Sequence, residues 1–323
     1  MPLRGKTSFL NWGLWLMVTQ LLCLVAAGAH AAPSCGLKIA DLSNTHFLGK
    51  SGLGYEVFDR TQYIEVINFT VEAARGTCPF VIGFSAGSSN AFDDRQLTAG
   101  GSMLHYQLFR DAAGTQILED IPLASESGVL TGVASAGAPP QTLHAVFAIP
   151  SLQVVPPGNY TDRIVVSAYE GTLADPVLRD QEKLTLSASV QSTTEFCLGD
   201  AVNFDPTYRT TCVEIGELEA GKVETVRLRA RSNAGYTITL TSQNGGALQN
   251  LAPGDSSRIP YVLDIDGRTA SLAGKKPVDI ANGYGLTSPL GDEHLLRFTI
   301  GDTRDASSGQ YEDTIEVTMY SHH

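Results

Sequence analysis

The closest match to a catalytic motif in the sequence is a G-x-S-x-G nucleophile elbow, Gly83-Phe84-Ser85-Ala86-Gly87. Such an elbow works because a strand turns sharply into a helix and exposes the serine beside an oxyanion hole. An apolar strand is expected before Ser85, but the residues after it lack the periodicity of an amphipathic helix. Asp93 with His105 or His144 could complete a triad in hydrolase order. A serine esterase would be labelled at Ser85 by a fluorophosphonate; we expect no labelling and predict that the protein is not an enzyme.

Four cysteines outside the N-terminal leader could bind a metal or form disulfides: Cys35, Cys78, Cys197 and Cys212. Zinc is disfavoured, because the sequence has no CxxC pair and no histidine near these cysteines. An even number of cysteines in an exported chain favours two disulfides. The spacing allows three pairings. Because an internal repeat divides the chain, we predict the pairs Cys35–Cys78 and Cys197–Cys212, and we expect no cofactor.

The first 31 residues have the features of a secretory signal peptide. Arg4 and Lys6 are basic, residues 12–27 are mostly apolar, and residues 29–31 form a small-x-small cleavage signal. The alternative, a single membrane anchor, is weaker because the apolar segment is short and ends in the cleavage signal. The sequence therefore predicts an exported protein.

The charge and composition narrow the function classes. The formal net charge is −12, and loss of the two basic leader residues would make it about −14. Because a chain this acidic repels the phosphate backbone, nucleic acid is not an expected partner. The 32 glycines and many short runs of Val, Thr, Ile and Leu favour an all-β fold.

The chain ends in an alternating segment, 309–320, in which Ile315, Val317 and Met319 are separated by polar residues. This period of two predicts a half-buried strand. The segment 158–169 is a near-copy of it, and both begin with a Gly-x-Tyr-x-Asp pattern. A further alternating run, 182–190, follows the first copy only. The second copy is therefore predicted to lack its final strand.

Other segments repeat in the same order, at an offset that drifts between about 151 and 157 residues. The matches pair 69–73 with 226–230, 106–108 with 261–263, and 143–149 with 294–300. Chance similarity between strands could explain one pair, but several ordered pairs make it a poor explanation. We predict two tandem immunoglobulin-like β-sandwich domains, 32–190 and 195–323, the second lacking its final strand.

Two segments of the first copy resemble the spore coat protein U domain family. The segment 156–166, Pro-Pro-Gly-Asn-Tyr-Thr-Asp-Arg-Ile-Val-Val, resembles the closing signature of that family, and 104–111 resembles its internal strand and turn. In the second copy, 229–236 and 309–320 carry the resemblance. The longer loops of the first copy depart from the family pattern. The family includes subunits of archaic chaperone–usher pili.

The resemblance implies a mechanism of assembly. Pilins of this type are immunoglobulin-like folds without a last strand, which a periplasmic chaperone lends and an adjacent pilin subunit later replaces by β-strand addition, at an outer-membrane usher. One wall of the acceptor groove would be lined by Tyr311, Ile315, Val317 and Met319. The first domain would be closed in cis by Leu184, Leu186, Ala188 and Val190.

The N-terminal segment suggests a direction of assembly. A shaft subunit needs a donor extension of about a dozen residues before its first cysteine. Only Ala32, Pro33 and Ser34 separate the predicted cleavage site from Cys35. A subunit that accepts a strand and donates none belongs at the distal end, so we expect a pilus tip subunit, exported through the periplasm to the cell surface.

A tip position implies adhesion, and with it a role in biofilm formation. The loops 42–58, 85–103 and 119–140 carry apolar residues that could form a contact surface for abiotic or host material: Phe47, Leu48, Leu53, Tyr55, Phe92, Leu97, Val129 and Leu130. The alternative is that these side chains pack under their own loops. A second class of function is also open, a free-standing secreted or spore-coat structural protein that enters no fibre.

Overall fold

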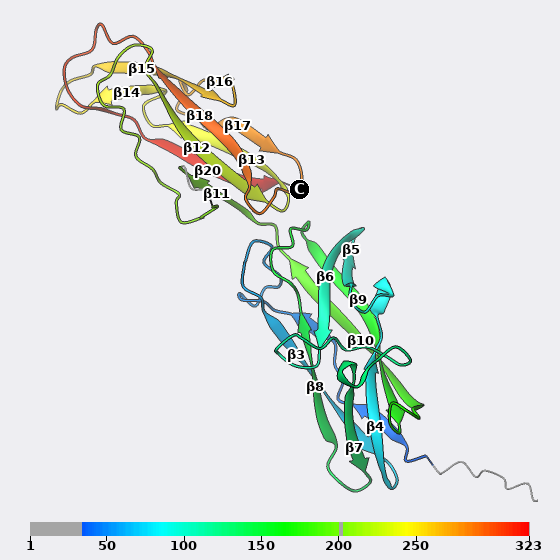
Figure 1. Cartoon of the computed structure of the whole chain (residues 1–323). Coiled ribbons are helices and arrows are strands. Elements are labelled where there is room, and N and C mark those ends of the chain that lie inside the picture. The colour runs from blue at the N-terminus through cyan, green and yellow to red at the C-terminus, as the bar shows by residue number, and fades with distance from the viewer. Residues whose placement is uncertain (1–33, 200–202, 323) are drawn as a thin grey trace, which may run out of the picture. The chain divides into compact units, whose positions relative to one another are not determined.

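The computed structural model describes residues 34–199 and 203–322, and this part of the chain is all-β, as predicted (Figure 1). Two short 3-10 helices, η1 (Gly87–Ser89) and η2 (Glu126–Gly128), are its only helical elements. Within these residues no helix has the length and apolar character needed to cross a bilayer. The predicted signal peptide, residues 1–31, lies outside the described residues.

The strands of the N-terminal half, 34–190, pair only among themselves in the described structure. Their hydrogen-bonded order is β1-β3-β8-β6-β5-β9-β10-β2, and β4 pairs with both β7 and β9. The bounds are β1 Leu37–Ala40, β2 Thr45–Phe47, β3 Ile64–Ala73, β4 Thr77–Phe84, β5 Arg95–Ala99, β6 Ser102–Phe109, β7 Leu130–Ser135, β8 Gln141–Ala148, β9 Gly158–Glu170 and β10 Val177–Val190.

One hydrophobic core fills the N-terminal strand set, because alternate residues of its strands point inward. In β9 the inward residues include Tyr160, Ile164 and Val166, all buried. The antiparallel neighbour β10 places Leu184 opposite Ile164 and Ala188 opposite Tyr160. The four residues expected to close this half in cis are at most 3% exposed.

The strands of the C-terminal half form two sheets. One has the order β11-β12-β18-β15-β14-β19 with β16 beside β15, and the other has the order β17-β13-β20. The bounds are β11 Thr194–Leu198, β12 Val223–Ser232, β13 Gly235–Ser242, β14 Ala247–Asn250, β15 Arg258–Ile265, β16 Arg268–Ala270, β17 Val278–Gly283, β18 Asp292–Ile300, β19 Tyr311–Glu312 and β20 Ile315–His322.

Strand pairing in the C-terminal half follows that of the N-terminal half. Strand β13 lies between β17 and β20, as β4 lies between β7 and β9, and β12 lies between β11 and β18, as β3 lies between β1 and β8. The register agrees too, since Thr98 pairs with Thr161 and Gln249 with Glu312, an offset of 151 in both strands. Among the described strands of the C-terminal half, β2 and β10 have no counterpart. The domain bounds 32–190 and 195–323 stay a prediction.

The long loops of the N-terminal half are tied together by one buried cation, Arg95 at the start of β5. Its side chain is 0% exposed. The guanidinium donates to the backbone oxygens of Phe84 (3.2 Å) and Leu118 (2.6 Å) and to Gln107 Oε1 (2.6 Å), among others. Burial lowers the pKa of Arg95 to about 10. Electrostatic interactions with Tyr106, Asp162 and Glu119 act in the opposite direction and raise it.

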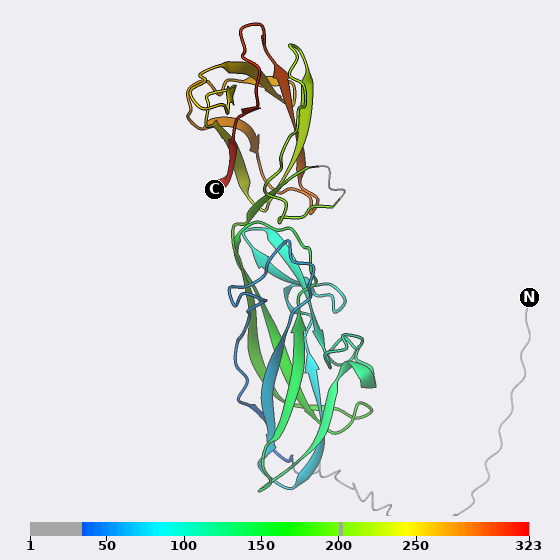
Figure 2. The same ribbon diagram turned by 90° about the vertical axis from the view of Figure 1, so that its left-hand side faces the viewer.

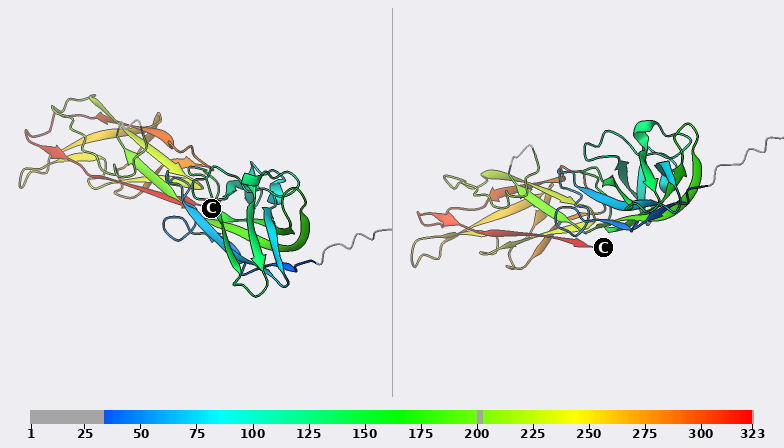
Figure 3. Two further views of the ribbon diagram at one scale, coloured as in Figure 1. Left: turned by 60° about the horizontal axis from the view of Figure 1, so that its bottom comes forward. Right: turned by 90° about the horizontal axis from the view of Figure 1, so that it is seen from below.

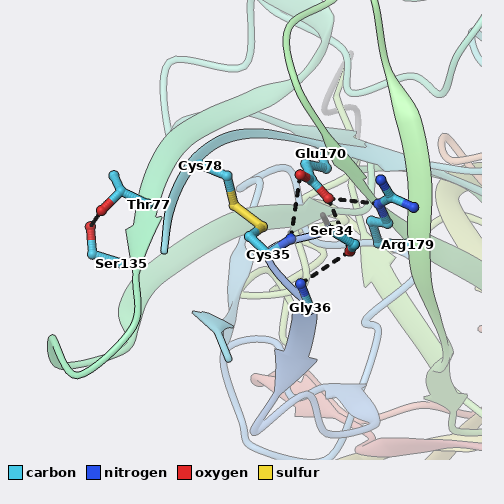
Figure 4. The surroundings of a disulfide bond; sticks show 8 residues. All are labelled: Ser34, Cys35, Gly36, Thr77, Cys78, Ser135, Glu170 and Arg179. Carbon is cyan, nitrogen blue, oxygen red and sulfur yellow. Dashed lines mark hydrogen bonds and ion pairs between the residues drawn. A yellow bond between two sulfur atoms is a disulfide. The ribbon is translucent and has the colours of Figure 1, made fainter. Parts of the chain in front are cut away.

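The disulfide Cys35–Cys78, as predicted, links the start of the described chain to β4, with 6.4 Å between the Cα atoms (Figure 4). Glu170, at the end of β9, lies beside it. This carboxylate accepts from the Cys35 amide (3.4 Å) and from Ser34 Oγ (3.2 Å), and it is paired with Arg179 Nε at 2.7 Å. Three segments distant in sequence therefore meet at this point.

The predicted second disulfide, Cys197–Cys212, is wrong in this structure, because both cysteines are free. Cys197 points into the protein from β11 and is 1% exposed, whereas Cys212 is exposed in the strandless segment between β11 and β12. A disulfide requires Cβ atoms about 4 Å apart and directed at each other. Cys197 and Cys212 are not joined in this way.

Candidate strand-acceptor site

The last strand of the chain, β20, has an unpaired edge. On one side β20 pairs with β13 along its whole length, from Ile315 opposite Ser242 to His322 opposite Gly235. On its other side no strand of residues 34–199 or 203–322 is paired with it. The strand, red in Figures 2 and 3, lies at the margin of the C-terminal strand set. Its outer backbone groups are therefore free to pair with another strand.

The inward face of β20 is apolar and incompletely covered. Ile315, Val317 and Met319 pack against the core of the C-terminal half, yet each is only half-buried. The equivalent residues of β9 are Ile164, Val166 and Ala168, and all three are 0% exposed. β10 pairs with β9 along this stretch and places the buried Leu184 opposite Ile164, with Glu182 and Asp180 opposite Val166 and Ala168, whereas no described strand pairs with the outer edge of β20.

Tyr311, the fourth predicted groove residue, lies in the separate short strand β19, where it pairs with Asn250 of β14. Its hydroxyl donates to the backbone oxygen of Ser307, 2.6 Å away. Tyr160 makes the same contact four residues back, to Pro156 O at 2.9 Å. The two tyrosine rings are therefore anchored in the same way, although only Tyr160 is fully buried.

The aspartates of the two Gly-x-Tyr-x-Asp patterns form a link that the sequence analysis missed. Asp162 Oδ2 accepts from the Tyr106 hydroxyl, and Asp313 Oδ2 accepts from the Tyr261 hydroxyl, both at 2.7 Å. Backbone amides supply further donors, Ser88 N to Asp162 Oδ1 at 3.1 Å and an equivalent loop amide to Asp313. The sequence signal for this link is the repeat match between 106–108 and 261–263, which includes both tyrosines.

These buried contacts raise tyrosine pKa values. Burial, with the hydrogen bond to the aspartate as the next cause, raises the pKa of both Tyr106 and Tyr261. Burial also raises the pKa of Tyr55 to about 12 and that of Tyr169 to about 12. The neutral hydroxyl is therefore favoured in the folded protein more than in the unfolded chain.

Stability should consequently fall in alkali. Below the unfolded tyrosine pKa of about 10, the stabilisation is complete; above it the unfolded state loses protons that the folded state retains. We expect a melting temperature that is level from about pH 8 to pH 9.5 and falls above about pH 10. Thermal unfolding followed by circular dichroism measures this. In Tyr261→Phe the alkaline slope should be smaller; an unchanged slope would argue against a titrating Tyr261.

The G-x-S-x-G segment is explained by packing. The Ser85 hydroxyl accepts from the Val165 amide at 2.8 Å, and the chain continues into the single turn of η1. A Cβ atom at Gly83 would lie 2.1 Å from Asp120 Oδ1, and one at Gly87 would lie 2.1 Å from Asp162 Oδ2. Both glycines are thus required by neighbouring carboxylates, which accounts for the motif without a nucleophile.

The residues that could complete a triad with Ser85 lie on the surface. His105 Nδ1 is 2.6 Å from Asp94 Oδ1 on the surface. Asp93 is exposed, and His144 is an exposed residue of β8 that lies opposite Asn68 of β3. The side chains named for a triad therefore point to solvent from different strands and loops.

The expected contact surface of the long loops is wrong for most of its residues. Five of the eight are core residues at most 6% exposed: Phe47, Tyr55, Leu97, Val129 and Leu130. Phe92 is half-buried, while Leu48 and Leu53 are 46% and 65% exposed. The loops fold back over the sandwich, and Tyr55 forms a parallel bridge with Val190. The five buried residues therefore fit the alternative, that these side chains pack under their own loops.

Residues 21–167 match the family model described as Spore Coat Protein U domain. None of the curated proteins compared matches the chain significantly. Among solved structures, a chain of the CsuC–CsuE chaperone–tip adhesion subunit pre-assembly complex from Csu pili of Acinetobacter baumannii is 11% identical, with a TM-score of 0.45, over 88% of this chain and 99% of that one.

Two further structures are similar at this level. The CupB6 tip adhesin of Pseudomonas aeruginosa is 10% identical, with a TM-score of 0.36, over 88% of this chain and 94% of that one. CfaE, the adhesive subunit of CFA/I fimbria of enterotoxigenic Escherichia coli, is 10% identical, with a TM-score of 0.35, over 89% and 82%. The predicted resemblance is confirmed by the family match over residues 21–167.

Proposed function

We propose that the protein is the tip subunit of a chaperone–usher pilus and that β20 accepts a strand from a partner. The observation that carries the proposal is the contrast between two equivalent strands. β9 is paired with β10 along its length, whereas none of the strands in 34–199 and 203–322 pairs with the outer edge of β20, whose inward apolar face is half-buried. An open edge beside an incompletely covered core is an aggregation site unless another strand occupies it.

The extent of the family match supports this division of roles. The match ends at Ser167, inside β9, so β10 lies outside the matched segment. A domain pattern that ends in this strand is completed in the N-terminal half by the chain's own β10. The C-terminal half would take its strand first from a periplasmic chaperone and then, at an outer-membrane usher, from the adjacent pilin subunit. This role is structural rather than catalytic, and it places the protein at the cell surface.

The proposal is tested by co-purification from the periplasm with a chaperone of the chaperone–usher class. The full chain should form a one-to-one complex, and Val317→Asp should abolish it because a carboxylate would enter the apolar groove. Thr318→Asp is the matched control, since Thr318 is the exposed neighbour in the same strand. A chain that stays monomeric alone, with β20 amides as protected from hydrogen exchange as those of β9, would instead support the free-standing structural protein.

We place the adhesive surface at three hairpin loops of the N-terminal half: 74–76, 136–140 and 171–176. They meet at one end of the strand set, because Ala136 N donates to Gly76 O at 2.7 Å and Gly171 N donates to Pro79 O at 2.9 Å. Residues 136–140, Ala-Gly-Ala-Pro-Pro, are all exposed and uncharged. The other two loops each carry one charged residue, Arg75 and Asp175, so the uncharged hairpin 136–140 is the part that suits an apolar abiotic or host material.

Attachment of bacteria to polystyrene tests this placement. Ala138→Asp in fully assembled fibres should reduce attachment at least several-fold, because a charge must be desolvated at the contact. Leu53→Asp is the control: Leu53 is 65% exposed in a loop that meets Val190 rather than these hairpins. Equal attachment by Ala138→Asp and unmodified fibres would remove this surface from consideration.

A further inference from the structure

The chain contains its own template for the strand that it accepts. Resting on the proposed function, we infer that the partner strand runs antiparallel to β20 and carries large apolar, large apolar, small and apolar residues at successive inward positions. The small residue faces Tyr311. The template is β10, whose inward residues are Leu184, Leu186, Ala188 and Val190.

The register of β10 on β9 assigns each inward position. Leu184 lies opposite Ile164, Leu186 opposite Asp162, and Ala188 opposite Tyr160. Residues directly opposite in an antiparallel pair point to the same face and are in contact range. The repeat offset of 151, which strand pairing also follows, transfers these positions to Ile315, Asp313 and Tyr311.

Tyr311 limits the size of the partner-strand residue that faces it. The ring of Tyr160 is buried with the small Ala188 across from it, both at 1% exposure. Tyr160 and Tyr311 make the same hydroxyl contact to the backbone four residues earlier, so the second ring is held in the same manner. A ring fixed at its far end cannot move aside for a branched partner. Extra methylenes in such a position force strain.

Asp313 determines whether the partner-strand residue opposite it is polar or apolar. Its Oδ2 already accepts from Tyr261 (2.7 Å) and from Ser242 Oγ (2.6 Å), and its Oδ1 accepts from the Asn244 amide (3.0 Å). Since its oxygens are occupied from within the domain, the carboxylate does not need a cationic partner strand. The equivalent Asp162 is equally engaged, and the residue across from it is Leu186.

Peptide binding to the full chain tests the inference. The probe is a labelled peptide copying residues 182–191, Glu-Lys-Leu-Thr-Leu-Ser-Ala-Ser-Val-Gln. In the peptide, Ala188→Leu should weaken binding by about tenfold or more, by overpacking against Tyr311. Ser187→Leu, which adds the same side chain on the opposite face, is the control and should bind within about twofold. The Tyr311→Ala chain should restore binding of the Ala188→Leu peptide, and the Ile315→Asp chain, whose carboxylate would lie opposite Leu184 of the peptide in the β10 register, should bind none.

The outcomes separate the inference from the proposed function. Equal binding of the Ala188→Leu and unmodified peptides overturns the size rule while leaving strand acceptance in place. If no peptide binds and β20 amides exchange as slowly as those of β9, strand acceptance fails, and the inference with it. The same segments joined to the C-terminus through a flexible linker give a second measurement. There, Ala188→Leu should lower the melting temperature relative to Ser187→Leu, and an equal melting temperature counts against the size rule.

Discussion

Leu186→Asp should leave the N-terminal strand set without a cooperative unfolding transition. Leu186 is 0% exposed, and it lies opposite Asp162, which is 4% exposed and already hydrogen-bonded. The substitution would place a second carboxylate beside the first without a cation to pair with it. The cost of burying such a group exceeds about 4–5 kcal/mol, a large part of the 5–15 kcal/mol that stabilises a typical domain.

Ser187→Asp is the matched control for this experiment. Ser187 is the next residue of β10, points to the other face, and contacts the ring nitrogen Nδ1 of His46. The same charge there should change the free energy of unfolding by less than about 1 kcal/mol. Urea unfolding followed by circular dichroism distinguishes the two variants. A Leu186→Asp protein with the parent midpoint would show that β10 does not close the N-terminal core.

Arg95→Met should destabilise the N-terminal half by about 3–5 kcal/mol, by removing the donors that several buried carbonyl groups share. Methionine fills much of the volume but leaves Phe84 O, Leu118 O and Gln107 Oε1 without the guanidinium. The loss is partly offset, because a buried charge is removed as well. The C-terminal half has Gly246 at the equivalent place, so this cation serves the longer loops of the N-terminal half alone.

Arg95→Lys separates charge from geometry. Lysine keeps the positive charge but offers three donors from one atom, whereas the guanidinium presents five in a planar fork. The loss should therefore be intermediate, with faster hydrogen exchange in the loop 85–94. The measurement is the urea midpoint of each variant. Identical midpoints for Arg95→Met and the unmodified protein would mean that other donors satisfy these carbonyls.

Short-range patterns predicted a large part of the fold. The period-two alternation of 158–169 and 182–190 correctly marked β9 and the second part of β10, because the pleat alone sends successive side chains to opposite faces, while the single strand expected over 309–320 is divided into β19 and β20. The ordered repeat anticipated the shared strand pairing of β3 and β12. It also favoured the Cys35–Cys78 pairing, because a bond within one copy needs no contact between copies.

Loop residues could not be placed in the same way. For Phe47 and Leu97 the sequence left open a contact surface or packing under their own loops, and both are at most 2% exposed. Their burial depends on strand pairing. β2, which contains Phe47, pairs with β10, a strand distant in sequence, and β5, which contains Leu97, pairs with β6 across a tight turn. The Cys197–Cys212 pairing failed for a related reason, because the orientation of a Cβ atom is not a property of spacing.

The sequence by itself predicted an alternating run, 182–190, after the first of the two matching strands, and so a difference between the two copies, since alternation is local and each residue carries it alone. Only the tertiary structure decided what that difference means for individual side chains. It buried Ile164 under β10 and left Ile315 half-covered, and it joined Asp313 to Tyr261 across 52 residues. Burial and hydrogen bonding of this kind arise from contacts between distant segments, which no window of the sequence contains.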